Sequence, residues 1–358
     1  MPLFSAFRDK KVLVTGHTGF KGSWLTQWLL LHGAKVCGYS DEVPTQPSAF
    51  EALSLSSQIE DHRGDIRDYD HLLKVFQAFE PEMAFHLAAQ PLVRESYRNP
   101  LLTFDVNVQG TANFLDCLRH VKSVRAGLVI TTDKVYEPSA LPKEHEEVDR
   151  LGGSDPYSAS KAAAELVFSS YTRSFFSEAN SAALASVRAG NVIGGGDWSS
   201  DRLIPDLIRS WKSEDPVQIR FPEAVRPWQH VLEPLSGYLK VGALLLEKNP
   251  KVRGESFNLG PVKTEDGSVQ KIVELTRKAF PELKVEISPE HRKGFKETHY
   301  LRLSWEKAHR VINWSPRLSL EESVNWTLDW YEHFYNGGNC IDLTKEQIKA
   351  YELRMESR

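Results

Sequence analysis

The stretch "TGHTGFKG", residues Thr15 to Gly22, joins the apolar run "KVLV" to "SWLTQWLLLHG", a segment of helical period. A glycine-rich turn between a first strand and a first helix lets backbone N–H groups approach an anion, and the helix N-terminus adds partial positive charge. The pyrophosphate of a dinucleotide fits this position. The spacing of Gly16, Gly19 and Gly22, G-x-x-G-x-x-G, is a weak signal alone. The alternative is a tight turn that binds nothing.

Short β-branched runs alternate with segments of helical period along the first half of the chain. "AKVCGYS", "MAFHLAA", "AGLVITT" and "AALASVRAG" predict strands, and "HLLKVFQAFEP", "LLTFDVNVQGTANFLDCLRH" and "PYSASKAAAELVFSSYTRSFF" predict helices. This alternation is typical of βαβ units on a parallel sheet. We therefore predict an α/β fold with a doubly wound (Rossmann) parallel sheet of six or seven strands.

The regular alternation ends after "RAGNVIGGGDW", where glycine, proline and tryptophan become frequent. We predict a dinucleotide-binding Rossmann domain over residues 1–190. A smaller α/β substrate-binding lobe is predicted over residues 191–358, with later segments able to cross back to the first domain.

The composition excludes several classes of protein. The chain has 358 residues with 41% hydrophobic content, enough for a large core. Lysine and arginine (44) nearly balance aspartate and glutamate (48), so we expect no nucleic-acid or membrane partner. Three cysteines, no signal-peptide pattern and no long apolar run predict a cytoplasmic protein without disulfides. The 12 histidines include no pair at metal-ligand spacing near a carboxylate, so we expect no metal.

The second and third predicted strands indicate which dinucleotide is bound. The second ends in "GYSDE", where Asp41 or Glu42 lies near the position of an acid that bonds the ribose of NAD, and no arginine is adjacent. This favours NAD over NADP. At the end of the next strand, Asp65 in "HRGDIRD" is placed to accept a hydrogen bond from an adenine amino group. Its alternative role is the N-cap of the following helix, which Asp68 can also fill.

Two later segments carry groups for proton transfer. "ITTDKVY" puts residues 131–134 at the carboxyl edge of a central strand, where open α/β sheets bind ligands. "PYSASK" gives Tyr157 and Lys161, an i,i+4 pair on one helix face. The ammonium of Lys161 is expected to lower the pKa of the Tyr157 phenol, so that the phenolate accepts a hydroxyl proton while hydride leaves the same carbon.

These residues together resemble the extended short-chain dehydrogenase/reductase superfamily over nearly the whole chain, and within it the chain is similar to the CDP-glucose 4,6-dehydratases. The stretches that carry the resemblance are "VTGHTGFKGSWL", "FHLAAQPLVRESY", "TTDKVY", "DPYSASK", "ASVRAGNVIGGGDW", "DRLIPD" and "RPWQHVLEPLSGYL". His17 and Lys21, which are less expected in a packed turn, belong to this family's version of the glycine loop. We expect Lys21 either to meet a phosphate or to extend outward.

The resemblance implies conversion of CDP-D-glucose to CDP-4-dehydro-6-deoxy-D-glucose, in deoxysugar synthesis of the O-antigen and lipopolysaccharide type. Tyr157, assisted by Thr132 and Lys161, would deprotonate the hydroxyl at carbon 4 while hydride passes to NAD⁺. Asp133 would protonate the leaving hydroxyl on carbon 6, provided that burial keeps it protonated. Lys134 would act in carbon 5 chemistry, as a neutral base or as a charged group that stabilises the enolate. The alternative for the last two residues is a simple pair at the strand end.

The same resemblance implies the binding residues. Besides Tyr157 and Lys161, the expected cofactor contacts are Gly16, His17, Thr18, Gly19, Phe20, Lys21, Gly22, Asp65, Ile66, Leu87, Ala88, Ala89, Asn107 and Thr131. The expected substrate contacts are Gln90 and Arg94 beside the sugar, and Asn191, Arg202 and Arg226 near the diphosphate. Arg188 is predicted to bind the diphosphate or to close an internal ion pair. Trp198 and Trp228 are predicted to stack on the base or to pack in the core.

Four further expectations concern specificity, assembly and function class. Residues 137–153, "EPSALPKEHEEVDRLGG", replace a family stretch with tryptophans and Gly-Tyr-Arg-Glu, so the preferred base stays open, although Lys143 can substitute in part. Glu297 and His299 are additional site candidates. The helices over residues 101–120 and 158–176 resemble the superfamily's four-helix interface and predict a homodimer, or a tetramer built from it. The alternative functions are another nucleotide-sugar 4,6-dehydratase, a 4-epimerase, or an inactive dinucleotide sensor.

Overall fold

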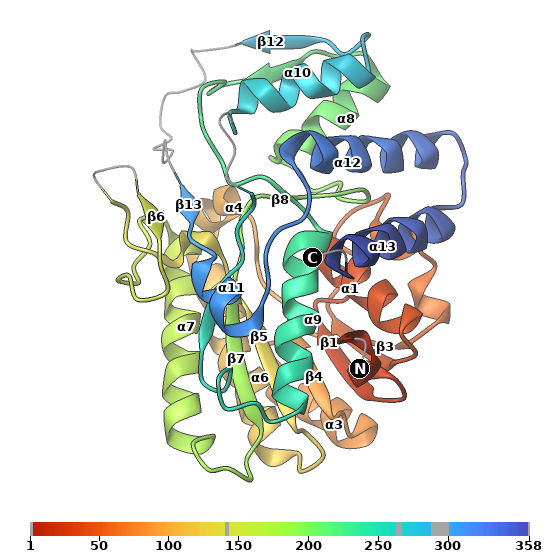
Figure 1. Cartoon of the computed structure of the whole chain (residues 1–358). Helices are drawn as coiled ribbons and strands as arrows, with labels where there is room; N and C mark the ends of the chain where they lie inside the picture. The colour runs from red at the N-terminus through yellow and green to blue at the C-terminus, as the bar shows by residue number, and fades with distance from the viewer. Residues whose placement is uncertain (1–2, 140–142, 263–266, 288–300, 357–358) are drawn as a thin grey trace.

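The predicted parallel sheet is present and has seven strands in the order β11-β7-β5-β4-β1-β2-β3, in a computed structural model that describes residues 3–139, 143–262, 267–287 and 301–356 (Figure 1). All neighbouring strands are parallel. The order reverses between β1 and β4, which confirms the doubly wound fold. The strands are β1 (Lys11–Thr15), β2 (Lys35–Ser40), β3 (Glu60–Arg63), β4 (Met83–His86), β5 (Ala126–Ile130), β7 (Ala183–Arg188) and β11 (Ser256–Asn258).

Helices cover both faces of this sheet, which is why its central strands read as apolar runs. Val12 and Val14 of β1 face α1 (Phe20–Leu31), α9 (Leu232–Leu246) and the 3-10 helix η1 (Leu3–Phe7), and pack there with Trp24. Leu13 points to the opposite face and packs with Phe114 against α3 (Tyr69–Phe79), α6 (Gly110–His120) and α7 (Pro156–Phe175). Because successive side chains of β1 point to opposite faces of the sheet, this strand contributes to a hydrophobic core on each face.

The segment between β4 and α6 is helical but irregular. It contains α4 (Val93–Arg98), α5 (Pro100–Phe104) and a π-helical turn, η3 (Asp105–Gln109), which leads into α6. The long helix predicted for residues 101–120 therefore has three parts. Short turns elsewhere are α2 (Ala49–Ala52), η2 (Leu55–Ser57) and η4 (Asp133–Val135).

A smaller lobe lies above the carboxyl edge of the sheet in Figure 1. It holds α8 (Leu203–Ser213), α10 (Val269–Ala279), α12 (Leu320–Tyr335) and the pair β9 (Val217–Ile219) with β12 (Val285–Ile287). Two further parallel pairs lie lower, β8 (Val192–Ile193) with β10 (Gln229–His230) and β6 (Glu144–His145) with β13 (Arg302–Leu303). The remaining helices are α11 (Glu306–Ile312) and α13 (Cys340–Glu356).

Segments that follow residue 190 pack against the seven-stranded sheet and its flanking helices. Strand β11 pairs with β7, and α9 packs against β5 and β7, although both follow residue 190. Helix α13 returns to α1, where Glu352 accepts a hydrogen bond from Trp28 Nε1 at 2.6 Å. The seven-stranded sheet therefore includes a strand, β11, from beyond residue 190. The division of the chain into two lobes at residue 190 remains a prediction.

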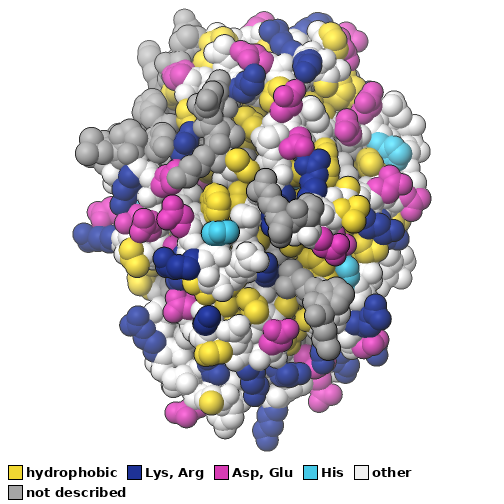
Figure 2. All heavy atoms as spheres, in the orientation of Figure 1, with side chains coloured by type: hydrophobic (Ala, Val, Ile, Leu, Met, Phe, Trp, Pro, Cys, Tyr) yellow, Lys and Arg dark blue, Asp and Glu magenta, His cyan; other side chains and the backbone are white. Residues whose placement is uncertain are grey.

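Charges are mixed on the surface, as the composition predicts. Figure 2 shows lysine and arginine side chains interspersed with aspartate and glutamate over the visible face. Across the described part of the chain, every helix is too short or too polar to span a bilayer.

Candidate active site

The glycine turn joins β1 to α1 in very little space. Gly16 has a φ of +74° and donates its amide to the Tyr39 carbonyl at 2.9 Å. A Cβ on Gly16 would lie 2.6 Å from the Ala88 amide nitrogen, and one on Gly22 would collide with the Gly16 carbonyl. Helix α1 begins after Gly19, which offers no capping side chain. The N–H groups of its first turn therefore suit an anion such as the pyrophosphate of a dinucleotide.

The imidazole of His17 is used inside the protein. Its Nε2 lies 2.9 Å from an Asp61 carboxylate oxygen, and its ring makes an edge contact with Phe50. A Cβ on Gly38 would collide with the same ring. Burial lowers the pKa of His17, with Asp61 opposing that effect. The other ring nitrogen, Nδ1, is buried and has no hydrogen-bond partner among the described residues.

Lys21 points into the molecule, so the alternative that it extends outward is wrong. Its ammonium donates to the Tyr238 hydroxyl at 3.5 Å and lies over that ring. Burial, followed by the charges of Lys161 and Arg202, lowers the pKa of Lys21 to about 7. Lys21 is thus close enough to the Tyr157–Lys161 helix to sense its charge.

The predicted adenine contact, Asp65, is engaged by a neighbour. Arg67 Nε donates to its two carboxylate oxygens at 3.0 and 2.9 Å, and this hydrogen bonding lowers the pKa of Asp65. Asp68 caps α3 by accepting the His71 amide at 3.0 Å. The N-cap alternative for Asp65 is therefore wrong, while Ile66 beside it is buried.

The residues after β4 lie behind the glycine turn. The Leu87 amide donates to the Thr15 carbonyl at 3.0 Å, and the Ala88 amide donates to Thr15 Oγ1 at 3.3 Å. Thr18 Oγ1 donates to the Glu42 carbonyl at 3.3 Å, which ties the turn to the end of β2. The turn and the β4 end are therefore adjacent, and they carry the predicted cofactor residues Thr18, Phe20, Leu87, Ala88 and Ala89.

Asn107 connects the loop after β4 to α7. Its Oδ1 accepts the Gln90 amide at 2.8 Å, and its Nδ2 donates to Ser160 Oγ at 2.9 Å. The Gln90 side chain donates to Thr103 at 2.8 Å and accepts the Leu92 amide at 2.6 Å. Both polar atoms of the Gln90 side chain thus bond within the loop, and one of its two amide N–H groups is left for the predicted substrate contact.

Four predicted catalytic residues come together where β5 ends and α7 begins. Asp155 caps α7, so that Tyr157 lies in its first turn and Lys161 one turn later. Lys161 Nζ donates to the Ile130 carbonyl at 3.0 Å, and Thr132 Oγ1 donates to Asp133 Oδ1 at 2.8 Å. The carboxyl edge of β5 therefore holds a hydroxyl, a carboxyl, a phenol and an ammonium.

Asp133 carries an unsatisfied buried atom. Its side chain is buried, and Oδ2 has no hydrogen-bond partner within the described residues. A buried polar atom without a partner needs an explanation, and a catalytic role is one such explanation. Lys134 next to it is half-buried, and its ammonium forms no ion pair in the described part of the chain. The alternative of a simple Asp133–Lys134 pair is therefore wrong.

The phenol of Tyr157 is less acidic than predicted. Burial raises the pKa of Tyr157 to about 12, while a hydrogen bond with the Thr132 side chain and the charge of Arg202 act to lower it. Burial also lowers the pKa of Lys161 to about 8. Burial is the largest influence on the Tyr157 phenol, which is why the expected lowering of its pKa is absent.

The predicted substrate arginines have different surroundings. Arg202 pairs with Asp197 at 2.8 Å, and its charge reaches Tyr157. Arg94 pairs with Asp201. Arg188 forms an internal ion pair with Glu165 at 2.9 Å, which is the second of its two predicted roles. Asn191 has a φ of +46°, and its carbonyl accepts the Gln229 amide at 3.2 Å.

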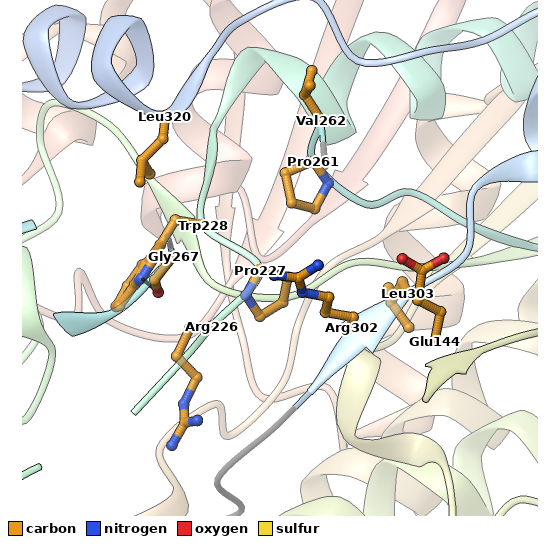
Figure 3. A pocket seen from close by; sticks show the side chains of 10 residues that line it. All are labelled: Glu144, Arg226, Pro227, Trp228, Pro261, Val262, Gly267, Arg302, Leu303 and Leu320. Atoms are coloured by element: carbon orange, nitrogen blue, oxygen red, sulfur yellow. Dashed lines mark hydrogen bonds between the residues drawn. The ribbon is translucent and has the colours of Figure 1, made fainter. Parts of the chain in front are cut away.

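Arg226 lines a small pocket beneath the upper lobe (Figure 3). Glu144 and Arg302 enter it from the paired strands β6 and β13, and Trp228 and Leu320 stand on the other side. The Trp228 indole donates to the Gly267 carbonyl at 3.0 Å. Trp198 packs among Trp330, Tyr331 and Phe334, so it belongs to the core.

Glu297 and His299 lie outside the described residues, as does part of the divergent segment 137–153, in which Lys143 pairs with Asp149 at 2.8 Å. Sequence reasoning missed Glu165, although it follows Lys161 at the same helical spacing. It also missed Tyr238, which comes from α9 and has no local signal.

One possible metal-ligand set is present among the described residues. Cys37, Glu60 and His62 bring three ligand atoms within 4.8 Å of one another on β2 and β3. Burial, with the charge of Glu60, raises the pKa of the Cys37 thiol to about 12, which opposes thiolate ligation.

A doubly wound sheet with tyrosine and lysine one helical turn apart at its carboxyl edge defines an extended short-chain dehydrogenase/reductase. The chain belongs to the GDP-mannose 4,6 dehydratase family, whose model matches residues 13–327. It is 44% identical to the CDP-glucose 4,6-dehydratase of Salmonella typhimurium over 353 residues, which cover 96% of this chain and 97% of that protein.

Solved structures agree on the fold. The epimerase Mth375 of Methanothermobacter thermautotrophicus has a TM-score of 0.80 at 25% identity, covering 94% of this chain and 96% of that one. The dTDP-glucose 4,6-dehydratase of Bacillus anthracis, in complex with NAD, has a TM-score of 0.75 at 20% identity, covering 93% and 99%.

Proposed function

We propose that this protein is an NAD-dependent CDP-glucose 4,6-dehydratase, which converts CDP-D-glucose to CDP-4-dehydro-6-deoxy-D-glucose and water. The observation that carries the proposal is the buried Asp133 carboxyl, whose Oδ2 lacks a partner in the described structure and which is bonded to Thr132. A 4-epimerase needs the tyrosine and the lysine but no acid at this place. The substrate follows from the 44% identical relative.

The first step is removal of the hydroxyl proton at carbon 4 of glucose. Tyr157 accepts this proton, and Thr132 hydrogen-bonds to the phenol and favours its ionised form. The chemistry that bound NAD⁺ would supply is acceptance of the hydride from carbon 4 and its return to carbon 6. The residues that would hold it are those of the glycine turn and the β4 end, and the uncapped N-terminus of α1 fits its pyrophosphate.

The second step is the elimination of water. The ketone at carbon 4 acidifies the hydrogen at carbon 5, and transfer of that proton to Lys134, acting as the base, leaves an enolate. Asp133 gives its proton to the hydroxyl on carbon 6, which departs as water and leaves a carbon 5–carbon 6 double bond. The Lys134 ammonium formed in this way stabilises the enolate and returns its proton to carbon 5. Addition of hydride at carbon 6 and of a proton at carbon 5 completes the methyl group.

Binding of the substrate diphosphate requires positively charged side chains. We assign the binding of the diphosphate to Arg202, whose charge lowers the pKa of Tyr157, and to Arg226, which lines the small pocket. We also assign substrate contacts to Arg94, which pairs with Asp201, to the loop that holds Gln90, and to Asn191.

We further propose a homodimer built on α4, α5 and α7. These neighbouring helices carry the exposed apolar side chains Tyr97, Leu101, Leu102, Phe104, Leu166 and Phe175. Leu101 is 82% exposed and Leu166 is 61% exposed, which is unusual for leucines on contacting helices. A cytoplasmic location is supported by the three cysteines, which are free and buried.

The test is a product assay with four substrates. The protein is incubated with NAD⁺ and with CDP-glucose, dTDP-glucose, UDP-glucose or GDP-mannose, and alkali-induced ultraviolet absorption reports 4-keto sugars. Dehydration of CDP-glucose above the others is expected, with deuterium from carbon 4 recovered in the carbon 6 methyl group. Epimerised sugar without loss of water would exclude the dehydratase.

A further inference from the structure

Glu165 lies on the same face of α7 as the catalytic pair. Tyr157, Lys161 and Glu165 follow one another at intervals of four residues, so their side chains line one edge of the helix facing β5. Glu165 is 2% exposed. The proposed reaction assigns it no step, yet it is the next charged group behind Lys161.

The carboxylate of Glu165 is fully bonded. Arg188 donates to it twice, from Nε to Oε1 at 3.0 Å and from Nη2 to Oε2 at 2.9 Å. Thr131 Oγ1 donates to Oε1, and Ser186 Oγ donates to Oε2 at 2.9 Å. Ser256 Oγ adds a fifth donor, to Oε2 at 3.4 Å. The five donors, from β7, β11 and the end of β5, fix this side chain in one orientation. Through Thr131 it also fixes the backbone immediately before Thr132.

The charge of Glu165 reaches Lys161. Burial lowers the pKa of Lys161, and Glu165 raises it, with the outcome at about 8. Without that negative charge, desolvation would act alone and would lower the pKa of Lys161 further, so that a larger share of Lys161 would be neutral near pH 7.

Other charged groups around this pair do not replace Glu165. Lys21 of α1 carries the same sign as Lys161 and repels it. His86 of β4 is held neutral, because burial followed by the charge of Lys161 lowers its pKa to about 3. Tyr136, after η4, donates to Asn258 and accepts from Arg188, so it contributes no charge. Glu165 is therefore the group that favours the ammonium form of Lys161.

We propose that Glu165 is a positioning residue of this active site, whose buried carboxylate fixes Thr131 at the end of β5 and keeps Lys161 charged beside Tyr157. The inference rests on the proposed function, in which Tyr157 must give up its proton near neutrality. A positive charge on the same helix face favours the phenolate. Lys161 supplies it only while it stays protonated, because the pKa of Lys161, about 8, lies below that of Tyr157, about 12.

The test is Glu165→Gln, studied by two measurements. The pH dependence of kcat with CDP-glucose is measured from pH 6 to pH 9.5. Lys161 is titrated separately by carbon NMR of protein labelled at the lysine ε-carbon, with its signal assigned by Lys161→Arg. We expect the Lys161 midpoint to fall by at least one unit, with kcat about eightfold lower at pH 8.5 and unchanged at pH 6. KM should stay within about twofold.

Two further variants separate this role from a purely structural one. Glu165→Gln/Arg188→Met removes both partners and leaves no unpaired buried charge, so it tests the Lys161 titration even if the single variant does not fold. Glu233→Gln, which alters a buried carboxylate on α9, should keep the wild-type pH profile. An unchanged Lys161 midpoint and alkaline limb would overturn the inference. Failure of the wild type to dehydrate CDP-glucose would overturn the proposed function, while the NMR titration would still decide the role of Glu165.

Discussion

Gly190 lies directly against the carboxyl group of Asp133, so that a Cβ on Gly190 would collide with all three of its carboxyl atoms. The Gly190 carbonyl accepts a hydrogen bond from the buried Gln229 side chain at 3.1 Å, which holds the backbone in place. The space that Asp133 needs at the end of β5 is therefore provided by the absence of a side chain after β7. This contact joins two strand ends that are far apart in the sequence.

Gly190→Ala should displace the carboxyl of Asp133 and impair the elimination. We expect dehydration of CDP-glucose to fall at least about a hundredfold, with a stability loss of about 1–3 kcal/mol from overpacking. Product formation and thermal unfolding measure the two effects. Gly152→Ala is the matched control, because its Cβ would find only Glu137 Cβ at 3.7 Å. Wild-type turnover in Gly190→Ala would show that Asp133 does not act from its observed position.

Asp133→Asn should separate oxidation from elimination. The amide keeps the hydrogen bond from Thr132 but cannot supply a proton to the departing hydroxyl. Reduced cofactor should then accumulate at 340 nm upon addition of CDP-glucose, while product formation falls about a thousandfold or more. Asp68→Asn serves as control, because asparagine caps a helix as well as aspartate. Asp133 loses its role as acid if the variant forms product at the normal rate.

The sequence predicts those features that depend on neighbours along the chain. The glycine turn needs Gly16 and Gly22 because backbone atoms approach them closely, and such needs are visible in local spacing. Alternating apolar runs likewise predict the strands of the parallel sheet. The position of Tyr157 and Lys161 on one face of α7 follows from helical period alone.

Features that depend on tertiary contacts could not be predicted in the same way. Lys21 points inward because Tyr238, from α9, receives its ammonium, and no local pattern connects the two. The pKa of Tyr157 was expected to fall because the sequence shows a nearby lysine but not the depth of burial. The sequence allows two roles for Arg188, and its ion pair with Glu165 is visible only in the folded structure.

Leu101→Glu and Leu166→Glu should each prevent dimer formation. A carboxylate at the centre of an apolar interface would have to be desolvated without a partner, which is costly. We expect the wild type to sediment as a dimer at micromolar concentration and each variant as a monomer. Leu353→Glu is the control, because Leu353 is 67% exposed on α13, outside the proposed interface. A wild type of one-chain mass would contradict the proposed homodimer.

Glu233→Gln should change how stability depends on pH. Glu233 Oε1 accepts the Arg317 and Leu318 amides at 2.8 and 2.6 Å, and Oε2 accepts the Tyr351 hydroxyl at 2.6 Å. Burial nevertheless raises the pKa of Glu233 to about 7 from 4.5. The folded state therefore binds the proton more tightly than the unfolded state, so this contribution to stability is complete below pH 4.5 and is lost as pH rises to 7.

Relative to Glu233→Gln, the wild type should lose on the order of 3 kcal/mol of unfolding free energy between pH 4 and pH 8. Denaturant unfolding of both proteins across this range measures the difference. Glu322→Gln should give the opposite sign, because hydrogen bonds from Ser319 and Arg354 outweigh burial and lower the pKa of Glu322. Parallel profiles for wild type and Glu233→Gln would mean that Glu233 stays ionised in the folded protein, held by its two amide donors.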